Sequence, residues 1–478
     1  MRVSDRPAML AQRLQAPLAA IFATVLLLAV HRSHGFTSLL YDSAHYWDLA
    51  SWTQITNVKS WRGYVFPALL APLRGLIELT SDQILTYRIG LSAVYGLLLT
   101  TVLPAAYQRA FGGKVTLIRR LVPVFLLALL FPGLLLYPLT DLPAALLAFG
   151  ALLCVLRALG RDSSRRQFFW LLVASGALMG AAYNTRTIYL FAGIPLGLLA
   201  LLTIRGPGLR APFPRWLGLA AFAVGLTAIS LPQLAINIRT HGVASPAVQS
   251  VINDRGLFAT QLAWGLTLQR YETTVAEGAP APQVYYLDPD GMRLFDRVSQ
   301  QGDLFSIGYY MRVLVQHPLQ FVALYTRHFF NGLDVRDGLV YTRKTSPARS
   351  RTALLNFLVL ALAVWVAVSI RQRQKMRPDA GFEPASAAWP AALAVLLLPV
   401  IAIIPGAIET RFFLPLHIVA YCTIAMHFDG PLLLRNLRQH WVAVPLALVL
   451  AAGAFFDVTL DTMSSIRPNW PDIYRNGR

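Results

Sequence analysis

Residues 16–50 have the sequence APLAAIFATVLLLAVHRSHGFTSLLYDSAHYWDLA. They begin the pattern that decides the fold. An apolar run from Ala16 to Val30 is followed at once by basic residues, and then by a loop that carries acids and aromatic rings. A cleaved signal peptide would need a small-x-small cleavage site after such a run, and none is present. We therefore expect an uncleaved first transmembrane helix over 16–31, followed by a polar loop.

The composition indicates a membrane protein. The chain has 478 residues, of which 56% are hydrophobic and 14% are charged, whereas soluble domains carry about 25% charged residues. The net charge of +19 does not indicate nucleic acid binding, because Lys and Arg lie largely in short loops between apolar runs. Cys154 and Cys422 each lie inside an apolar run, which suits neither a disulfide framework nor a zinc site.

Ten further apolar runs follow the first, and a transmembrane helix needs about 20 mostly apolar residues. We predict an all-α polytopic membrane protein with about eleven transmembrane helices, over 16–31, 86–107, 121–137, 142–158, 168–184, 187–204, 216–236, 352–370, 389–406, 412–428 and 441–457. Some of these runs are short and would span with little tilt or with local thinning of the bilayer.

Alternate loops between these runs are basic and nearly free of acids. They are residues 1–15, 108–120, 159–167, 205–215, 371–388 and 429–440. The positive-inside rule places such loops in the cytoplasm, so we expect a cytoplasmic N-terminus and an extracytoplasmic C-terminus. The large outer loop lacks cysteines, which favours a bacterial inner membrane and leaves an endoplasmic reticulum membrane as the alternative.

Two long segments are then extracytoplasmic. The first, 32–85, contains Tyr64–Leu79, a proline-broken apolar stretch that predicts a helix lying on the membrane surface. The second, 237–351, is long enough to be a functional loop or a small domain. We thus divide the chain into an N-terminal membrane region (1–236), whose first outer loop is catalytic, an extracytoplasmic loop region (237–351) and a C-terminal membrane region (352–478).

The first outer loop contains a group of residues that suits acid–base chemistry. On a helix, Asp42, His45 and Tyr46 would share one face, whereas Asp48 would lie elsewhere. Partial burial raises the pKa of a carboxylate and makes it a better proton acceptor, so Asp42 is the candidate general base. The alternative is that Asp42 caps the N-terminus of a helix.

Two later turns carry ionisable residues at an expected membrane boundary, where such residues are functional candidates. Asp141 lies between two apolar runs, either as a site residue or as the cap of the next helix. Arg186 and the pair Glu409 and Arg411 lie in outer turns, where arginine is unexpected. Arginine can form paired hydrogen bonds to the phosphate of a lipid-linked substrate, and the alternative is contact with ordinary lipid phosphates.

The large outer loop adds Arg270 and His328, each beside aromatic residues. Aromatic rings next to polar groups suit the binding of a sugar, although for His328 taken alone a structural role is the favoured alternative. The sequence contains no zinc-type His/Glu spacing, no phosphate-binding glycine loop and no Ser-x-x-Lys pair.

Four motifs, in this order along the chain, resemble those of the glycosyltransferase C (GT-C) superfamily. They are Asp42-Ser-Ala-His-Tyr-Trp-Asp48-Leu-Ala, Arg62-Gly-Tyr-Val-Phe-Pro67, Thr140-Asp141-Leu-Pro and Glu409-Thr-Arg411-Phe-Phe-Leu-Pro415. The branch that they resemble most contains protein O-mannosyltransferases and lipid A aminoarabinose transferases. Ser43 stands where many members have Glu, which weakens any metal or second-acid role at that position.

The resemblance implies a GT-C-like fold and transfer of a sugar, with inversion, from a polyprenyl-phosphate donor. Asp42 would deprotonate the acceptor, and Arg411, with Arg186 as a second candidate, would hold the leaving phosphate. The other candidate substrate-binding residues are His45, Tyr46, Asp48, Asp141, Arg270, His328 and Glu409. The expected partners are membrane lipids, the donor, and a lipid, glycan or protein acceptor. No cofactor is assigned, and a divalent metal remains open. The sugar can be mannose, arabinose or aminoarabinose.

Two other classes of protein have many membrane spans and act on similar substrates. A transporter or flippase for lipid-linked saccharides would place polar residues and broken helices in mid-membrane and would show internal repeats, whereas here the polar residues gather at one surface. A polysaccharide polymerase or ligase would use a lipid-diphosphate donor, and an acidic motif directly after the first helix argues against it.

Overall fold

The computed structural model describes residues 6–56, 62–159, 164–202, 215–252, 255–274, 283–336, 338–342, 350–376 and 388–467. The chain forms two compact units. Unit 1 consists of residues 1–249, 366–399 and 418–428, and unit 2 consists of residues 250–365, 400–417 and 429–478.

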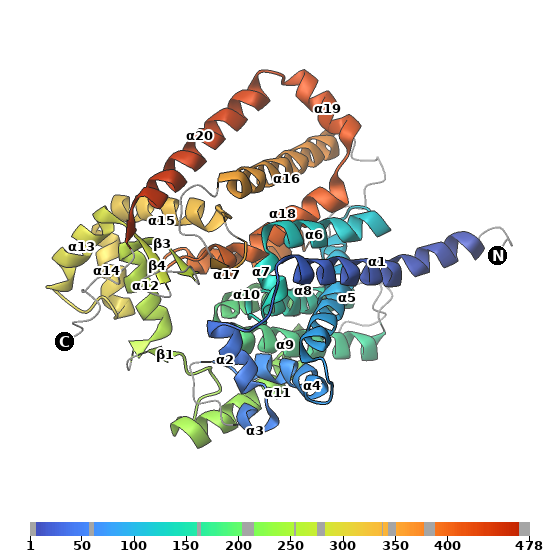
Figure 1. Ribbon diagram of the computed structural model, residues 1–478, viewed down its shortest axis with the longest axis horizontal. Helices are drawn as coiled ribbons and strands as arrows, with labels where there is room; N and C mark the ends of the chain where they lie inside the picture. Colours follow the sequence, from blue (N-terminus) through green and yellow to red (C-terminus); the bar gives the residue numbers. More distant parts are fainter. Residues whose placement is uncertain are drawn as a thin grey trace. The chain divides into compact units, whose positions relative to one another are not determined.

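Unit 1 is helical, and its long helices lie on the apolar runs of the sequence (Figure 1). Its helices are α1 (Arg6–Ser33), α2 (Tyr41–Leu49), α3 (Trp52–Ile55), α4 (Val65–Glu78), α5 (Gln83–Phe111), α6 (Leu117–Leu130), α7 (Pro132–Leu136), α8 (Asp141–Ala158), α9 (Arg165–Thr185), the short η2 (Thr187–Tyr189), α10 (Leu190–Leu202) and α11 (Arg215–His241). Parts of α16 (Ser350–Met376), α17 (Trp389–Ile403) and α18 (Leu414–His427) also belong to it. Helix α4 confirms the helix predicted over 64–79, and its position on the membrane surface stays a prediction.

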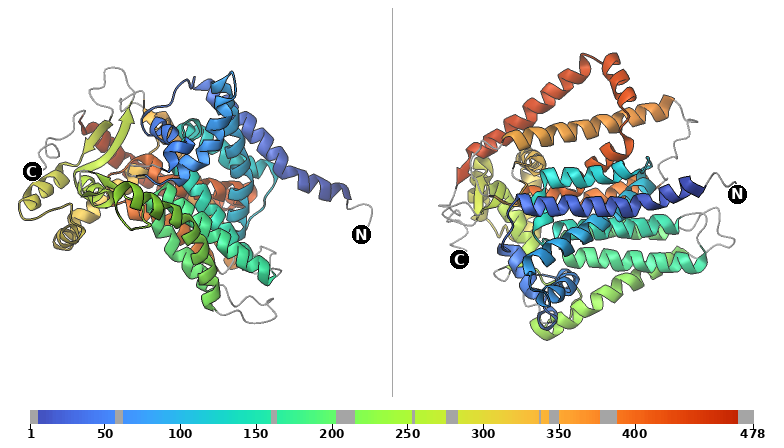
Figure 2. Two further views of the ribbon diagram at one scale, coloured as in Figure 1. Left: turned by 90° about the horizontal axis from the view of Figure 1, so that it is seen from below. Right: turned by 45° about the vertical axis from the view of Figure 1, so that its right-hand side comes forward.

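Helix α9 packs against both α8 and α11 (Figures 1 and 2). Its contact with α11 is close because both helices carry glycines there. A Cβ atom at Gly176 would lie 1.8 Å from the backbone oxygen of Phe222, and one at Gly225 would lie 1.9 Å from that of Val173. Membrane helices use small residues in this way to bring two backbones into van der Waals contact. This packing fixes the C-terminal end of α9 next to α11, where the candidate site lies.

Among the described residues, seven helices are long and apolar enough to cross a membrane. They are Leu14–Ser33, Gln83–Phe111, Asp141–Ala158, Arg165–Thr185, Trp216–His241, Arg351–Gln372 and Ala443–Ser464. An eighth is reached if α18 and α19 (Gly430–Gln439), which are bent by 100°, count as one span. The protein is therefore a helical protein with several candidate membrane spans, and the predicted count of eleven is not confirmed.

The difference in count has a local cause. The predicted run 121–137 breaks at Phe131, because Pro132 begins a new helix and lacks the N–H that would continue the old one. Two other predicted runs form apolar helices of fewer than 18 residues, Thr187–Leu201 and Trp389–Ile403. Mean hydropathy describes the average composition of a run of about 20 residues and does not show where a helix breaks within that run.

Unit 2 holds a small β-sheet, which corrects the prediction of an all-α fold. Its elements are β1 (Val251–Ile252), β2 (Arg255–Gly256), α12 (Leu257–Thr267), β3 (Leu268–Thr274), β4 (Gln283–Leu287), α13 (Pro289–Ser299), α14 (Ile307–Gln316), α15 (Pro318–Leu333), β5 (Tyr341–Thr342), η3 (Thr410–Phe413), α19, α20 (Ala443–Ser464) and β6 (Ile466–Arg467). Four strands form a sheet in the order β5-β3-β4-β6, in which β3 is antiparallel to β4 and parallel to β5, and β6 is antiparallel to β4. The strands are short, so no alternating pattern in the sequence indicates them.

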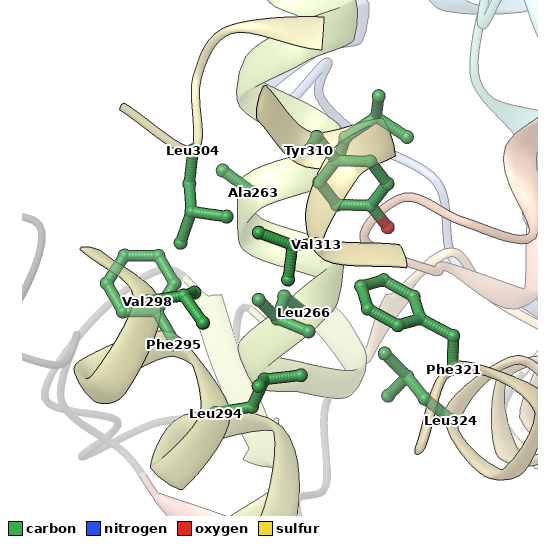
Figure 3. Close-up of a cluster of buried hydrophobic side chains, with 11 residues drawn as sticks. Ala263, Leu266, Leu294, Phe295, Val298, Leu304, Tyr310, Val313, Phe321 and Leu324 are labelled. Carbon is green, nitrogen blue, oxygen red and sulfur yellow. The ribbon is translucent and has the colours of Figure 1, made fainter. Parts of the chain in front are cut away.

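Helices α12 to α15 of unit 2 enclose a hydrophobic cluster (Figure 3). Its buried members are Leu262, Ala263, Leu266, Leu294, Phe295, Val298, Leu304, Tyr310, Val313, Phe321 and Leu324. On each helix they recur at intervals of three or four residues, as expected of an amphipathic helix that buries one face. Burying each large side chain contributes about 1.5–3 kcal/mol, so the cluster holds the four helices together.

Candidate active site

Helix α2 carries the first acidic motif and begins at a strained residue. Leu40 is its N-cap, and its N–H donates to the Ser43 hydroxyl group (3.0 Å), which donates in turn to the Leu40 carbonyl (2.5 Å). Tyr41 has a φ of 43°, in the left-handed region that non-glycine residues rarely adopt. Such strain costs about 1–3 kcal/mol and is concentrated at functional sites. Asp42 lies in the first turn and is not the N-cap, so a capping role for Asp42 is wrong.

Asp42 forms an ion pair with Arg62, a residue of the second motif to which the sequence assigned no role. Arg62 Nη2 donates to Asp42 Oδ1 at 2.5 Å, and the guanidinium lies over the ring of Tyr46, 4.3 Å from its centre. Burial by itself would lower the pKa of Arg62, but Tyr46 and Asp42 outweigh it and raise that pKa above its ordinary value. The Arg62 side chain is 8% exposed and the Asp42 side chain 37%. Arg62 is thus a fixed, buried cation that holds an accessible carboxylate.

His45 and Tyr46 lie one turn after Asp42 on the same helix, as predicted. Tyr46 is buried, whereas His45 is half-buried. Burial and the charge of Arg62 lower the pKa of His45, against the opposing effect of Asp42 and Asp48. His45 is therefore uncharged at neutral pH.

The C-terminal end of α2 is held by Arg74 of α4. Its Nη1 donates to the carbonyl oxygens of Trp47 (2.7 Å), which also accepts the N–H of Ala50, and of Asp48 (3.0 Å). The Trp47 ring meets the ring of Tyr87 in α5 edge to face, with 5.6 Å between their centres. The Asp48 side chain is exposed, as a residue that contacts a substrate would be.

Asp141 forms an ion pair with Arg186. Asp141 is the first residue of α8, whose N-cap is Thr140, so a capping role for Asp141 is also wrong. Arg186 directly follows α9, and its Nη1 donates to Asp141 Oδ1. The Asp141 side chain is 3% exposed and the Arg186 side chain 17%. Arg186 therefore neutralises a buried carboxylate, so its presence at this turn does not by itself require a substrate.

The segments that carry the two ion pairs touch each other. A Cβ atom at Gly63 would lie 2.0 Å from the backbone oxygen of Asn184, so only glycine fits against this turn. The N–H of Val65 donates to Asn184 Oδ1 at 2.8 Å. The Tyr64 hydroxyl group donates to the carbonyl of Ile229 at 2.9 Å, three residues before a proline inside α11. The Asp42–Arg62 pair and the Asp141–Arg186 pair thus lie on adjoining turns of unit 1.

A row of buried amides continues from this contact. Asn184 Nδ2 donates to Gln233 Oε1 (2.8 Å), and Gln233 Nε2 donates to Asn237 Oδ1 (2.9 Å). Asn237 Nδ2 then donates to the carbonyls of Ser245 (2.6 Å) and Ala247 (2.7 Å). Because each buried amide relies on the next for its partner, the row orients the Asn184 side chain that holds Val65.

Arg270 lies in a buried ion cluster of unit 2. Its Nη2 donates to Glu272 Oε1 at 2.6 Å, and its Nη1 donates to the carbonyl of Asp334 at 2.8 Å. Burial raises the pKa of Asp334, against the opposing charges of Arg270 and Arg336. The Arg270 side chain is 3% exposed, so its surroundings are those of a structural ion pair.

The late motif packs beside this cluster on β3. Arg411 Nε donates to Glu409 Oε2 at 2.5 Å, and the Thr273 hydroxyl group donates to Glu409 Oε1 at 3.1 Å. The N–H of Tyr271 donates to the carbonyl of Ile408 at 2.9 Å, which joins the motif to the strand. The structure therefore brings Glu409 and Arg411 next to the strand that carries Arg270.

His328 of α15 is fully buried. Its Nδ1 lies 2.6 Å from the carbonyl oxygen of Ile404 and its Nε2 lies 2.7 Å from that of Leu268. Burial lowers the pKa of His328, against these two carbonyls. Both ring nitrogens thus face the backbone, which favours the structural alternative for this histidine.

The predicted site residues fall into two groups. Unit 1 holds Asp42, His45, Tyr46, Asp48, Asp141 and Arg186, and unit 2 holds Arg270, His328, Glu409 and Arg411. Within the described ranges, no group of three or more His, Cys, Asp or Glu side chains could hold a metal ion.

Two residues of unit 1 were missed as site residues. Arg62 had the same signal that marked Arg186, a basic residue on the predicted outer side, where it is unexpected. Asn184 had a weaker signal, an amide at the end of an apolar run. Its importance depends on contacts with residues 119 and 49 positions away, which no local pattern reveals.

No protein-family model matches the sequence, and no curated protein matches it. Among solved structures, the chain is similar to the archaeal oligosaccharyltransferase AglB from Archaeoglobus fulgidus in complex with an inhibitory peptide and a dolichol-phosphate, with 14% sequence identity and a TM-score of 0.43. The match covers 95% of this chain and 56% of that one, so the chain spans little more than half the length of AglB. A similarity of this size identifies neither the fold nor the activity.

Proposed function

We propose that the protein is an integral membrane glycosyltransferase of the GT-C type. It moves a sugar from a polyprenyl-phosphate donor to an acceptor on the extracytoplasmic face. The proposal is carried by one observation, the two carboxylate–guanidinium pairs, Asp42 with Arg62 and Asp141 with Arg186, on adjoining turns. Asp141 begins one candidate span and Arg186 directly follows another, so this pair lies where the phosphate of a membrane lipid is expected. A carboxylate can accept the proton of the acceptor, and a guanidinium can bind the phosphate.

In the proposed reaction the Asp42 carboxylate takes the proton of an acceptor hydroxyl group. The acceptor oxygen forms a bond to the anomeric carbon from the face opposite the phosphate. The bond from that carbon to the phosphate oxygen breaks at the same time. Polyprenyl phosphate leaves with the electron pair, and the configuration at the anomeric carbon is inverted.

Arg62 has two consequences for this step. Its positive charge lies against the negative charge of the Asp42 carboxylate, which is the group proposed to accept the proton. The same interaction fixes the direction in which the carboxylate faces. The strained backbone at Tyr41 supports the view that this direction is under functional constraint.

The remaining roles are proposed with different support. Arg186 lies on the turn beside the Asp42 pair and is proposed to stabilise the charge that grows on the leaving phosphate. His45, Tyr46 and Asp48 are proposed to contact the sugar or the acceptor, because they share α2 with Asp42. Asp141 is proposed to act through Arg186. The phosphate-binding role of Arg411, with Glu409 to orient it, rests on the sequence motif. The buried partners of Arg270 and His328 favour structural roles for these two.

The test uses the full-length protein in lipid nanodiscs with polyprenyl-phosphate donors that carry labelled mannose, arabinose or aminoarabinose, and membrane extract as the acceptor source. Transfer of label to lipid, glycan or protein is measured. Asp42→Asn keeps the size of the side chain and should reduce transfer by about 10²–10⁴-fold. Asp290→Asn, which changes an exposed carboxylate on α13, should leave transfer unchanged. Normal turnover by Asp42→Asn rules out Asp42 as the base.

The same preparation separates the alternatives. Movement of label across proteoliposomes without any new glycosidic bond would favour a transporter, and preference for a diphosphate donor would favour a polymerase or ligase. The bend between α18 and α19 gives the transporter no support, because it falls at residues 428–429, beside the basic loop predicted at 429–440 and away from the middle of a predicted span.

A further inference from the structure

The helices α14 and α15 of unit 2 have two opposite apolar faces. One face supplies Tyr310, Val313, Phe321 and Leu324 to the buried cluster (Figure 3). The other face exposes large apolar side chains, which are Ile307 (51%), Met311 (49%) and Val315 (72%) on α14 and Leu319 (83%), Val322 (62%) and Phe329 (36%) on α15. Neither helix is among the candidate membrane spans found in the described residues. Crossing the membrane therefore does not account for the exposed face.

The exposed side chains form an ordered surface. On α14 they recur every fourth residue, and on α15 at intervals of three and seven, so each set follows one side of its helix. Only His317 separates the two helices, and the helices pack against each other. An apolar surface that extends over two helices indicates a contact with another apolar phase or molecule.

The C-terminal end of α15 touches those parts of two candidate spans that belong to unit 2, near the ends of the spans. Asn356 Nδ2 of α16 donates to the carbonyl of Leu333 at 2.6 Å, and Asn331 Nδ2 donates to the hydroxyl group of Thr462 in α20 at 2.9 Å. The rings of Phe330 and Phe455 meet with 6.1 Å between their centres. The candidate span in α16 begins at Arg351. At 1.5 Å per residue, Asn356 lies about 8 Å along the helix from that residue. The end of α15 thus lies next to the ends of two candidate spans.

The charges of this segment suit a lipid surface. Residues 304–333 contain no Asp or Glu. Arg312 is exposed on α14 next to Met311. A guanidinium beside an apolar surface binds lipid phosphates while the apolar side chains enter the acyl region. A water-facing helix pair would carry charges of both signs.

We propose that α14 and α15 lie in the surface of the bilayer. The six exposed apolar side chains enter the acyl chains of the adjacent leaflet, and Arg312 binds phosphate at the headgroup level. Unit 2 is then bound to the membrane by this surface in addition to its spanning helices. The inference does not depend on the proposed sugar transfer.

The test places a fluorescent NBD label at single cysteines in full-length protein that carries Cys154→Ala and Cys422→Ala. The protein is reconstituted in liposomes of phosphatidylcholine and phosphatidylglycerol. Val315→Cys is the test position and Ser299→Cys, on the exposed side of α13, is the matched control. We expect a blue-shifted emission at Val315→Cys that nitroxide-labelled lipids quench severalfold more strongly than the emission at Ser299→Cys. Aqueous iodide should quench only the control.

Leu319→Cys on α15 is a second test position in case Val315→Cys does not fold, and it should behave as Val315→Cys does. Strong iodide quenching at both test positions, with lipid quenching equal to that at Ser299→Cys, would overturn the proposal. Cross-linking between two copies through these cysteines, without lipid quenching, would also overturn it and would assign the surface to a second copy of the chain.

Discussion

Replacing Asn184 by Ala should release the segment that carries Arg62 from the rest of unit 1. The substitution removes two hydrogen bonds of 2.8 Å, one from the N–H of Val65 and one to Gln233. Both remaining groups are buried, and each buried polar group without a partner costs about 1–3 kcal/mol. The two losses together give about 2–6 kcal/mol, at the lower end if water enters the vacated space.

A matched control lies on the same helix. The hydroxyl group of Ser175 donates to the carbonyl of Ala151 at 2.9 Å inside the contact between α8 and α9. Ser175→Ala removes this one buried hydrogen bond, which is worth about 1 kcal/mol, and does not touch the segment that carries Arg62. It therefore separates a general loss of stability in α9 from the specific loss of the Val65 contact.

Hydrogen exchange of full-length protein in nanodiscs measures the effect where it should occur. A local loss of about 2 kcal/mol corresponds to roughly 30-fold faster exchange of the Val65 amide. Ser175→Ala should leave exchange at Val65 close to that of the unchanged protein. If transfer is measured as well, Asn184→Ala should lower kcat by more than the loss of folded protein, judged from its melting temperature, can explain. The reason is that Asn184 acts as a positioning residue for Arg62 and Asp42.

Two outcomes would refute this reasoning. Unchanged protection of the Val65 amide in Asn184→Ala would mean that the contact does not hold the segment. Equal deprotection in Asn184→Ala and Ser175→Ala would mean that both act through the stability of α9 alone.

Arg186→Met leaves the buried carboxylate of Asp141 without its cation and should lower the free energy of unfolding by about 3–5 kcal/mol, much of it restored by adding Asp141→Asn. Melting curves of the single and double variants check this, and the absence of recovery would contradict it. Gly176→Ala puts a methyl group 1.8 Å from a backbone oxygen of α11 and should cost about 1–3 kcal/mol or more, whereas Gly197→Ala, with 3.9 Å to the nearest atom, should be neutral or stabilising in the same melts. Burial and a neighbouring guanidinium lower the pKa of His45 in the folded state, so the unfolded state binds the proton first and stability falls as the pH drops below about 6.5. His45→Gln should make the melting temperature less sensitive to pH in this range, and an unchanged profile would contradict the assignment.

The membrane helices were predictable because their signal is local. A run of apolar residues forms a helix in lipid whatever its neighbours are, since the backbone must satisfy its own hydrogen bonds there. The prediction erred where a single residue outweighs a window average, as at Phe131 and Pro132, where the helix breaks. It also missed the sheet of unit 2, because β3 and β4 are buried on both faces and show no alternation, and the other strands have only two residues.

The candidate residues were chosen from the sequence by a related signal, and their roles stay predictions. A charged residue at the boundary of an apolar run is costly and needs an explanation, which singled out Asp141, Arg186, Glu409 and Arg411 from the sequence. Asp42 was chosen as a carboxylate suited to accept a proton. Their partners were not predictable. Asp141 and Arg186 are 45 residues apart and meet because α8 and α9 run side by side, which depends on packing along the whole of both helices.

By itself, the sequence determined which segments are apolar enough to form helices in lipid and which ionisable groups stand at the edge of those segments, since both follow from the transfer of each residue between water and hydrocarbon. Only the tertiary structure decided that Arg62 turns toward Asp42, that glycine at position 63 lets one turn rest on Asn184, and that α14 and α15 keep an apolar face exposed. These features arise from distances of a few ångströms between residues far apart in the chain. Short-range sequence patterns carry no information about such distances.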